Sequence, residues 1–210
     1  MNLRLHVLMD TVTISPGDLP REIGNMAQGG ASVIQLRGKS ATTRQLLDYG
    51  RVVRELCLQN HLAFIVNDRL DVALALEADG VHVGQDDMPV SIVRKLAPSL
   101  TVGLSAGSLQ EIECAADCPP DYFGLGPVFA TLSKDDAGMP LGTEKTVRLV
   151  KRAAAIAPVV AIGGINPENA AQAWKSGVDG VAVISAVMNA SDKRTQCLRL
   201  LAARGLAGLG

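Results

Sequence analysis

The chain has 210 residues, of which 48% are hydrophobic and only 3% aromatic, and it carries a formal net charge of −1. This near-neutral balance gives no bulk attraction to nucleic acid or to a membrane surface, and we expect neither as a partner. The longest apolar run, residues 153–165, is interrupted by Pro158, Gly163 and Gly164, which excludes a bilayer-spanning helix there.

Strand-like and helix-periodic segments alternate along the whole chain. Strict alternation favours a parallel sheet with helical crossovers, and eight such units close into a barrel. We therefore expect an α/β fold, a single (β/α)8 TIM barrel domain over residues 1–210, with a doubly wound open sheet as the alternative. The expected strands cover residues 3–9, 32–37, 62–66, 80–84, 101–105, 121–125, 158–162 and 179–184. The expected helices cover residues 18–28, 42–59, 69–77, 89–97, 108–117, 143–156, 167–176 and 191–203.

A short pattern recurs at the start of every second expected strand. It reads Ser-Val-Ile from residue 32, Asp-Gly-Val from 79, Asp-Tyr-Phe from 121 and Asp-Gly-Val from 179. Each copy would mark the turn from a helix into an even-numbered strand. The spacing suits two βα units, so the repeat indicates quarter-barrels.

The second expected strand ends in two cations. Because side chains alternate along a strand, Gln35, Arg37 and Lys39 share one side, while Ile34 and Leu36 face the helices. Gln35 then points into the barrel, and the two cations at its mouth can bind diphosphate, arginine as a fork and lysine as a point charge. The alternative is a solvated strand end, but a glutamine directed into a barrel needs a polar partner, which favours a binding site.

The next two strands end in acidic residues. Asn67 and Asp68 follow the third strand, and Asp86 and Asp87 follow the fourth. Mg²⁺ takes one or two carboxylates together with phosphate oxygens and water, so the sequence predicts a magnesium site here. Asp68 could instead cap the following helix. His82 lies within its strand, and we expect it to be a packed core histidine rather than a ligand.

Polar residues also follow the fifth and sixth strands. Ser105 ends the fifth strand and is uninformative alone. A long loop at residues 127–141 follows the sixth, and long loops at this face of a barrel are usually functional. Its Thr131, Ser133 and Lys134 suit an anionic substrate.

Strands seven and eight end in glycine- and serine-containing turns, Ala-Ile-Gly-Gly-Ile at residues 161–165 and Val-Ile-Ser-Ala at residues 183–186. Loops after these two strands form the common phosphate site of barrels, and glycine lets the backbone approach the anion. Ordinary tight turns are the alternative. Together with the diphosphate and Mg²⁺ groups near strands two to five, these turns predict an enzyme that joins two phosphorylated substrates with loss of diphosphate. No Ser-His or Cys-His pair for nucleophilic catalysis is apparent.

The four cysteines are Cys57, Cys114, Cys118 and Cys197, and no further Cys or His follows at metal-ligand spacing. We expect free structural thiols and a reducing, cytoplasmic location.

These residues fall into motifs that resemble those of the thiamine phosphate synthase family, from about residue 5 to 190. The matching motifs are Gln35-Leu36-Arg37-x-Lys39, Asn67-Asp68-Arg69, Gly80-Val81-His82-Val83-Gly84-Gln85-x-Asp87, Gly103-x-Ser105, Gly124-x-Gly126-Pro127-Val128-Phe129, Thr131-x-Ser133-Lys134, Ala161-Ile162-Gly163-Gly164-Ile165 and Val183-Ile184-Ser185-Ala186.

The resemblance implies a (β/α)8 barrel and a Mg²⁺-dependent transferase, often dimeric. It would join hydroxymethylpyrimidine diphosphate to hydroxyethylthiazole phosphate, by departure of diphosphate and capture of a pyrimidine methylene cation. The implied roles are pyrimidine binding for Gln35, diphosphate binding for Arg37, Lys39, Asn67, Ser105 and Lys134, Mg²⁺ binding for Asp68 and Asp87, thiazole contact for Thr131 and Ser133, and thiazole phosphate binding for Gly164, Ile184 and Ser185. Catalysis would rest on Arg37, Lys39, Ser105 and Lys134.

The sequence departs from the family pattern at Gly107, where histidine is frequent, and at Ser133, where threonine is common. Two other functions stay open. Thiazole tautomerases share the barrel, but they weaken the cation and Gly-Gln-x-Asp motifs, and some carry histidine where this chain has Pro127. The second of these alternatives is a non-catalytic barrel that binds thiamine intermediates.

Overall fold

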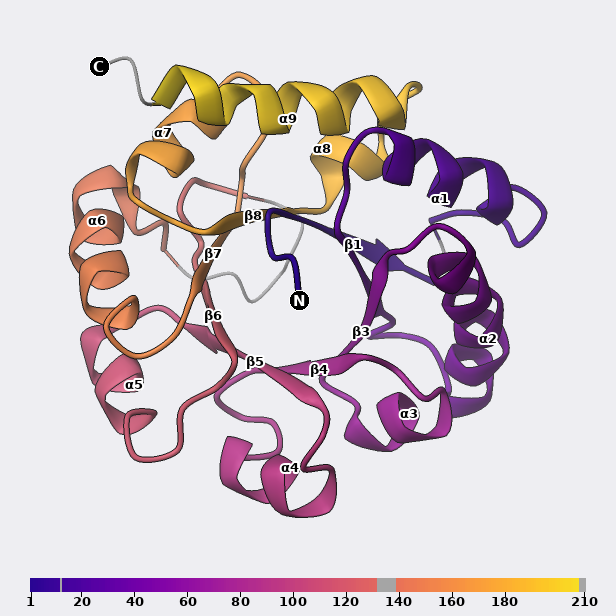
Figure 1. Ribbon diagram of the computed structural model, residues 1–210, viewed down its shortest axis with the longest axis horizontal. Helices are drawn as coiled ribbons and strands as arrows, with labels where there is room; N and C mark the ends of the chain where they lie inside the picture. The colour runs from indigo at the N-terminus through magenta and orange to yellow at the C-terminus, as the bar shows by residue number, and fades with distance from the viewer. Residues whose placement is uncertain (12, 132–138, 208–210) are drawn as a thin grey trace.

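Eight parallel strands, hydrogen-bonded in chain order, close into a barrel in the computed structural model, which describes residues 1–11, 13–131 and 139–207. Strand β8 returns to pair with β1, so the sheet has no free edge. The predicted (β/α)8 barrel is therefore confirmed over the open sheet, and Figure 1 shows the strands encircled by helices. The strands are β1 (Leu5–Asp10), β2 (Val33–Arg37), β3 (Ala63–Asn67), β4 (Gly80–Val83), β5 (Thr101–Ala106), β6 (Tyr122–Leu125), β7 (Val159–Ile162) and β8 (Gly180–Val183).

The helices form the outer layer, and the first seven lie where the sequence periodicity predicts them. They are α1 (Leu19–Gln28), α2 (Thr43–Gln59), α3 (Leu70–Ala75), α4 (Val90–Leu96), α5 (Leu109–Cys114), α6 (Gly142–Ala153) and α7 (Ala170–Lys175). Two features differ from expectation. The helix α8 (Ser185–Met188) occupies a segment that we expected to be a loop, because four residues are too few to leave a periodic pattern. The helix α9 (Lys193–Ala207) continues past its expected end at residue 203.

Side chains of each strand point alternately into the barrel and toward the helices. In β2, Ile34 and Leu36 belong to the large outer core, whereas Val33 belongs to a small inner cluster, as the alternation predicts. Gln35 faces the inside and is 3% exposed. The inner cluster comprises Leu8, Val33, Ile65, Tyr122, Val160 and Ala182.

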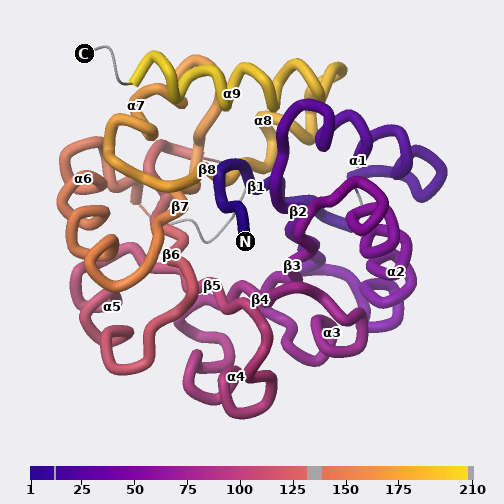
Figure 2. The backbone as a smooth tube through the Cα atoms, in the orientation of Figure 1, coloured from indigo at the N-terminus to yellow at the C-terminus, as the bar shows by residue number. Residues whose placement is uncertain are grey.

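The amino-terminal segment covers one end of the barrel (Figure 2). Leu3 packs against the inner cluster, and the Val181 N–H donates to the Arg4 carbonyl at 3.0 Å. A side chain at Gly180 would collide with the Leu3 carbonyl, so glycine permits this close approach. The carboxyl ends of the strands are left as the open mouth.

The repeated sequence pattern corresponds to a repeated hydrogen-bonded clamp. In each clamp, the side chain of the residue just before an even-numbered strand accepts a hydrogen bond from the backbone N–H of a residue near the start of the preceding strand. The backbone N–H of the first residue donates in return to the carbonyl of the second. The side-chain contacts are Leu5 N to Ser32 Oγ at 3.0 Å, Phe64 N to Asp79 Oδ2 at 2.7 Å, Val102 N to Asp121 Oδ2 at 2.7 Å and Val159 N to Asp179 Oδ2 at 2.8 Å. The quarter-barrel repeat is thus a device that sets the stagger of neighbouring strands.

All four cysteines are free thiols, as expected. Burial raises the pKa of the Cys57 and Cys197 thiols to about 12, which keeps them protonated and unreactive. Across the described ranges, no helix is both long enough and apolar enough to cross a membrane.

Candidate active site

A cavity of about 430 Å³ opens at the carboxyl ends of the strands. Loops after strands β2 to β8 all contribute to its wall, which is the position of active sites in (β/α)8 barrels. Most of the residues singled out from the sequence lie together here: Arg37, Lys39, Asn67, Asp68, Asp87, Ser105, Thr131, Gly164, Ile184 and Ser185. Ser133 and Lys134 fall outside the described residues, and Gln35 lines a second, smaller cavity.

The cationic side of the cavity comes from β2. Arg37 is not a solvated strand end, because its side chain is 11% exposed and its guanidinium contacts the Asp10 carboxylate at 3.3 Å. The Arg37 Nε atom is buried and has no hydrogen-bond partner among the described residues. Such a donor is costly unless a ligand or water satisfies it, so this arginine is suited to an anion. Sequence reasoning missed Asp10, although β1 ends in this carboxylate in register with Arg37.

The acidic side comes from the ends of β3 and β4. Helix α3 has Arg69 at its N-cap and no side-chain capping bond, so Asp68 does not serve as the helix cap that was the alternative. Asp68, Asp86 and Asp87 all face the cavity. Oδ2 of Asp87 accepts a hydrogen bond from the Gly84 N–H at 2.7 Å, which fixes this carboxylate in its loop.

These carboxylates fit a magnesium ion. In the part of the chain that the structure describes, no group of three or more His, Cys, Asp or Glu side chains could hold a metal without help. Mg²⁺ does not require such a cage, because it takes one or two carboxylates plus substrate phosphates and water. Asp68 and Asp87, which come from neighbouring strands and line one cavity, supply that number.

The opposite side is formed by the turns after β7 and β8. Gly163 and Gly164 have φ values of 101° and 64°, which favour glycine. A Cβ at Gly164 would come within 2.9 Å of the Phe129 Cβ and collide with the Ala130 carbonyl. Asn169 holds the turn by donating to the Gly164 carbonyl at 2.9 Å. This turn without side chains lines the cavity beside Ser185, the first residue of α8.

Below the main cavity lies a pocket of about 20 Å³ inside the barrel, lined by Gln35, His6, His82 and Tyr122 among others. Ser105 and Gly124 line both spaces, so the two spaces adjoin. Burial lowers the pKa of His6 to about 3 and raises that of Tyr122 well above its usual range, so both side chains are neutral.

His82 is buried, as expected of a core histidine, but it also contacts the site. Its Nε2 lies 2.9 Å from Ser105 Oγ, and its Nδ1 lies 2.9 Å from the Tyr122 hydroxyl. This contact brings together a serine and a histidine that we did not pair from the sequence, but the contact alone does not make a nucleophilic pair. The pair joins strands β4 and β5, and the sequence separation of 23 residues conceals it. Tyr122 was also missed, although an inward-facing tyrosine in an apolar strand is a usable signal.

Two further polar side chains, Glu111 and Gln85, form hydrogen bonds with the backbone around the cavity. Glu111 lines the cavity and accepts a hydrogen bond from the Gly107 N–H at 2.6 Å, at the position where we noted the missing histidine. The Gln85 side-chain amide donates to the Ser105 carbonyl at 2.6 Å. Ser105 is thus held through both its backbone and its hydroxyl.

Comparison with known proteins gives a consistent result. Residues 5–187 match the family described as thiamine monophosphate synthase. A thiamine-phosphate synthase of Moorella thermoacetica is 51% identical over 173 residues, covering 82% of this chain and 81% of that protein. One from Chloroflexus aurantiacus is 46% identical over 190 residues, covering 90% of this chain and 87% of that protein. Among solved structures, thiamine phosphate pyrophosphorylase from Pyrococcus furiosus superimposes with a TM-score of 0.87 at 40% identity, covering 100% and 98% of the two chains.

Proposed function

The chain belongs to the thiamine monophosphate synthase family and has that family's transferase activity, and we propose that it joins hydroxymethylpyrimidine diphosphate to hydroxyethylthiazole phosphate in the cavity at the barrel mouth. The observation that supports placing this reaction in the cavity is that two groups of residues suited to anions line it, each at the ends of different strands. Arg37, Lys39 and the carboxylates lie at the ends of β2 to β4, and Gly164 and Ser185 lie at the ends of β7 and β8.

On the first side, Arg37, Lys39, Asn67 and Ser105 would hold the diphosphate of the pyrimidine substrate. The buried Arg37 Nε, which has no described protein partner, offers a donor to a phosphate oxygen. Arg37 is held by Asp10 and Ser105 by His82 before the substrate arrives, and such preorganised groups stabilise charge that develops on a leaving group. Lys134 of the loop after β6 would join them by analogy with the family motif.

Asp68 and Asp87 would hold Mg²⁺ on this same side. When bound, the ion would neutralise part of the charge that accumulates on the departing diphosphate. The ion would lie between these carboxylates and a diphosphate that the cations of β2 hold from the other side. We favour Asp87 over Asp86 because the Gly84 N–H orients the Asp87 carboxylate.

The remaining residues would position the two organic groups. Gln35 presents a buried amide in the small pocket that adjoins the cavity, from where it would hydrogen-bond the edge of a pyrimidine held in the cavity itself. Thr131, with Ser133, would contact the thiazole, and the backbone near Gly164, Ile184 and Ser185 would hold its phosphate. The bond between the pyrimidine methylene carbon and diphosphate then breaks, and the thiazole nitrogen captures the pyrimidine methylene cation that results. Catalysis on this account is positioning and electrostatics.

The test is an assay with both phosphorylated substrates, following diphosphate and thiamine phosphate together. We expect the two products in equal amounts when Mg²⁺ is present and neither after chelation. A tautomerase would need neither diphosphate chemistry nor metal. Isomerisation of the thiazole phosphate carboxylate without metal, with no diphosphate released, would overturn the proposal. We also expect a cytoplasmic homodimer, which sedimentation and cell fractionation can test.

A further inference from the structure

Three side chains from consecutive strands form one hydrogen-bonded chain that leads from the barrel interior to the cavity. The Tyr122 hydroxyl in β6 lies 2.9 Å from His82 Nδ1 in β4, and His82 Nε2 lies 2.9 Å from Ser105 Oγ in β5. Tyr122 is 1% exposed and His82 is 8% exposed, whereas Ser105 lines the cavity. This row of three side chains therefore begins at the buried Tyr122 and ends at Ser105, which faces the cavity.

Two glycines in the surrounding strands leave room for these three side chains. A Cβ at Gly103 would collide with the Tyr122 ring and with His82 Nδ1. A Cβ at Gly124 would lie 2.8 Å from His82 Cε1, closer than such contacts normally occur. Any larger residue at either position would displace the rings, so the space around the three side chains is built into the strands.

The direction of the hydrogen bonds follows from the buried end. Burial raises the pKa of Tyr122, so its phenol stays protonated and must donate. Within the described ranges its only hydrogen-bond partner is His82 Nδ1, which must then accept. A neutral imidazole that accepts at Nδ1 carries its proton on Nε2 and donates to Ser105 Oγ. The reverse direction would leave the phenol hydrogen buried without a described partner, which is costly.

We propose that Tyr122 and His82 are positioning residues that direct the Ser105 hydroxyl hydrogen into the cavity, where it donates to the departing diphosphate. The inference rests on the proposed function, which places the diphosphate beside Ser105. Because His82 Nε2 already carries a proton, it cannot take the serine proton, and Ser105 stays a hydrogen-bond donor rather than a nucleophile. The Gln85 amide holds the backbone of the same serine.

The tautomer of His82 tests the direction of the two hydrogen bonds, and its measurement needs no substrate. Nitrogen-15 NMR of histidine-labelled protein, with the His82 signals assigned by their loss in His82→Gln, reports which ring nitrogen is protonated. We expect protonation at Nε2 in the wild type and loss of that preference in Tyr122→Phe. Protonation at Nδ1 in the wild type would overturn the proposal.

Kinetics test the consequence. Tyr122→Phe removes one hydroxyl and keeps the ring, and we expect kcat to fall about tenfold, since one hydrogen bond of about 1.4 kcal/mol corresponds to that factor. The KM for thiazole phosphate should not change. Tyr49→Phe is the matched control, because the Tyr49 hydroxyl donates to the Ile14 carbonyl at 3.0 Å in the outer layer, and it should keep the wild-type kcat.

A double-mutant cycle separates this role from a merely structural one. If Tyr122 acts through the serine, Tyr122→Phe should have no further effect on kcat in a Ser105→Ala background. Losses that multiply would overturn the proposal. A wild-type protein that shows the expected His82 tautomer but makes no thiamine phosphate would instead refute the proposed function.

Discussion

Asp68 has a φ of 65°, a backbone conformation that few residues other than glycine adopt. Its N–H donates to the His82 carbonyl at 2.7 Å, and the His82 ring contacts Ser105. Strained backbone of this kind persists where the surroundings fix it, and it clusters at functional sites. One buried histidine thus supports both an acidic residue and a hydroxyl of the same cavity.

The assignment of the metal-binding carboxylate can be tested by charge removal alone. Asp87→Asn keeps an oxygen that can accept from the Gly84 N–H but removes the charge, so turnover should fall by at least about a hundredfold if this carboxylate holds Mg²⁺. Asp86→Asn is the control from the same loop and should lose much less. Steady-state kinetics over a range of Mg²⁺ concentrations make the comparison, and equal losses from the two variants would show that the assignment is wrong.

His6 gives a prediction about pH. Its pKa is about 3 in the folded protein because burial disfavours the charged form, against about 6.5 when unfolded. Below pH 6.5 the unfolded chain binds a proton that the folded chain does not, so stability is lost as the pH falls. Between about pH 6.5 and about pH 3, His6 should lower the free energy of unfolding by about 1.4 kcal/mol for each unit by which the pH falls.

The variant His6→Phe keeps a ring beside Tyr122 and removes the titration. Urea unfolding at pH 7, 6 and 5 should therefore show a steeper loss of unfolding free energy for the wild type than for the variant. Parallel pH profiles would contradict the burial of a neutral His6.

At the scale of elements, the barrel is held in register by the four clamps that precede the even-numbered strands. Asp179 accepts from the Val159 N–H at 2.8 Å, and its own N–H donates to the Val159 carbonyl at 2.8 Å. Each clamp ties the start of one strand to the next βα unit. The clamps explain why the sequence repeats while the site residues beyond them differ.

Removing one clamp should destabilise the barrel. We expect Asp179→Ala to cost about 1.5–3 kcal/mol, the range for a hydrogen bond to a charged group. Asp48→Ala is the control, since Asp48 pairs with Arg51 at the surface, both side chains are exposed, and surface pairs contribute little. Urea unfolding of the two variants makes the comparison. Equal, small effects would mean that the repeat has no structural role.

The sequence was sufficient to predict the order and type of the elements, because apolar alternation and helical periodicity persist through the chain. It was also sufficient to bring Arg37, Asp68 and Gly164 to one cavity, since all parallel strands end at the same face. It could not reveal α8, which has only four residues. It also could not reveal contacts across strands, such as His82 with Ser105 or Arg37 with Asp10, because these depend on register.

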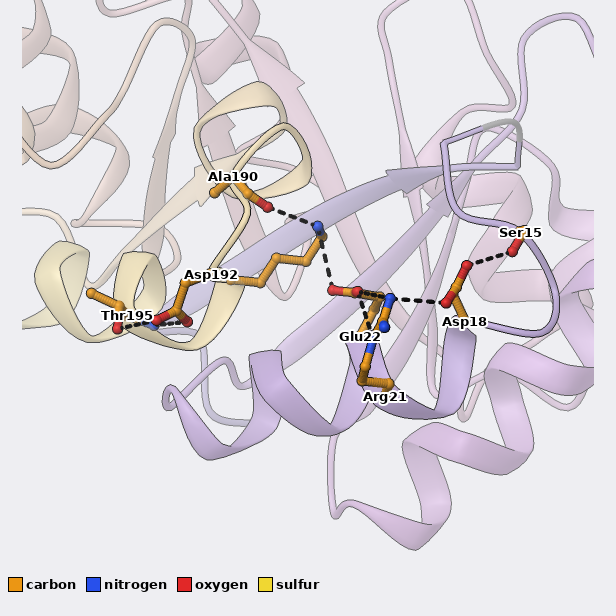
Figure 3. Close-up of polar contacts among 8 residues, drawn as sticks. Ser15, Asp18, Arg21, Glu22, Ala190, Asp192 and Thr195 are labelled. Atoms are coloured by element: carbon orange, nitrogen blue, oxygen red, sulfur yellow. Dashed lines mark hydrogen bonds and ion pairs between the residues drawn. The ribbon is translucent and has the colours of Figure 1, made fainter.

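At the scale of the whole molecule, the first and last helices meet where the barrel closes. Lys193 at the start of α9 pairs with Glu22 of α1 at 3.3 Å and donates to the Ala190 carbonyl at 3.0 Å (Figure 3). Both charged side chains are largely buried, at 10% and 13% exposure. A side chain at Gly29 would come within 2.6 Å of the Arg194 carbonyl, so the two helices also pack closely.

Breaking this contact should weaken the closure. Among the described residues, Lys193→Met leaves the buried Glu22 carboxylate with the exposed Arg21 as its remaining charged partner. We expect a loss of about 3 kcal/mol, the low end for a broken buried pair. The double variant Lys193→Met with Glu22→Leu should recover part of that loss. Thermal and urea unfolding measure both. A double variant that is less stable than the single one would contradict a buried ion pair at this position.

The central claim is that the barrel mouth holds two phosphate-bearing groups at once, on opposite sides of one cavity. The most direct measurement is calorimetric titration of hydroxyethylthiazole phosphate into protein already saturated with diphosphate and Mg²⁺, with Arg37→Ala and Gly164→Ala as variants that each alter one side. We predict that the wild type still binds one equivalent, with an affinity within about threefold of that without diphosphate. Arg37→Ala should weaken diphosphate binding at least about tenfold and spare the thiazole phosphate, and Gly164→Ala should do the reverse. Competition between the two ligands for a single site in the wild type would contradict the account.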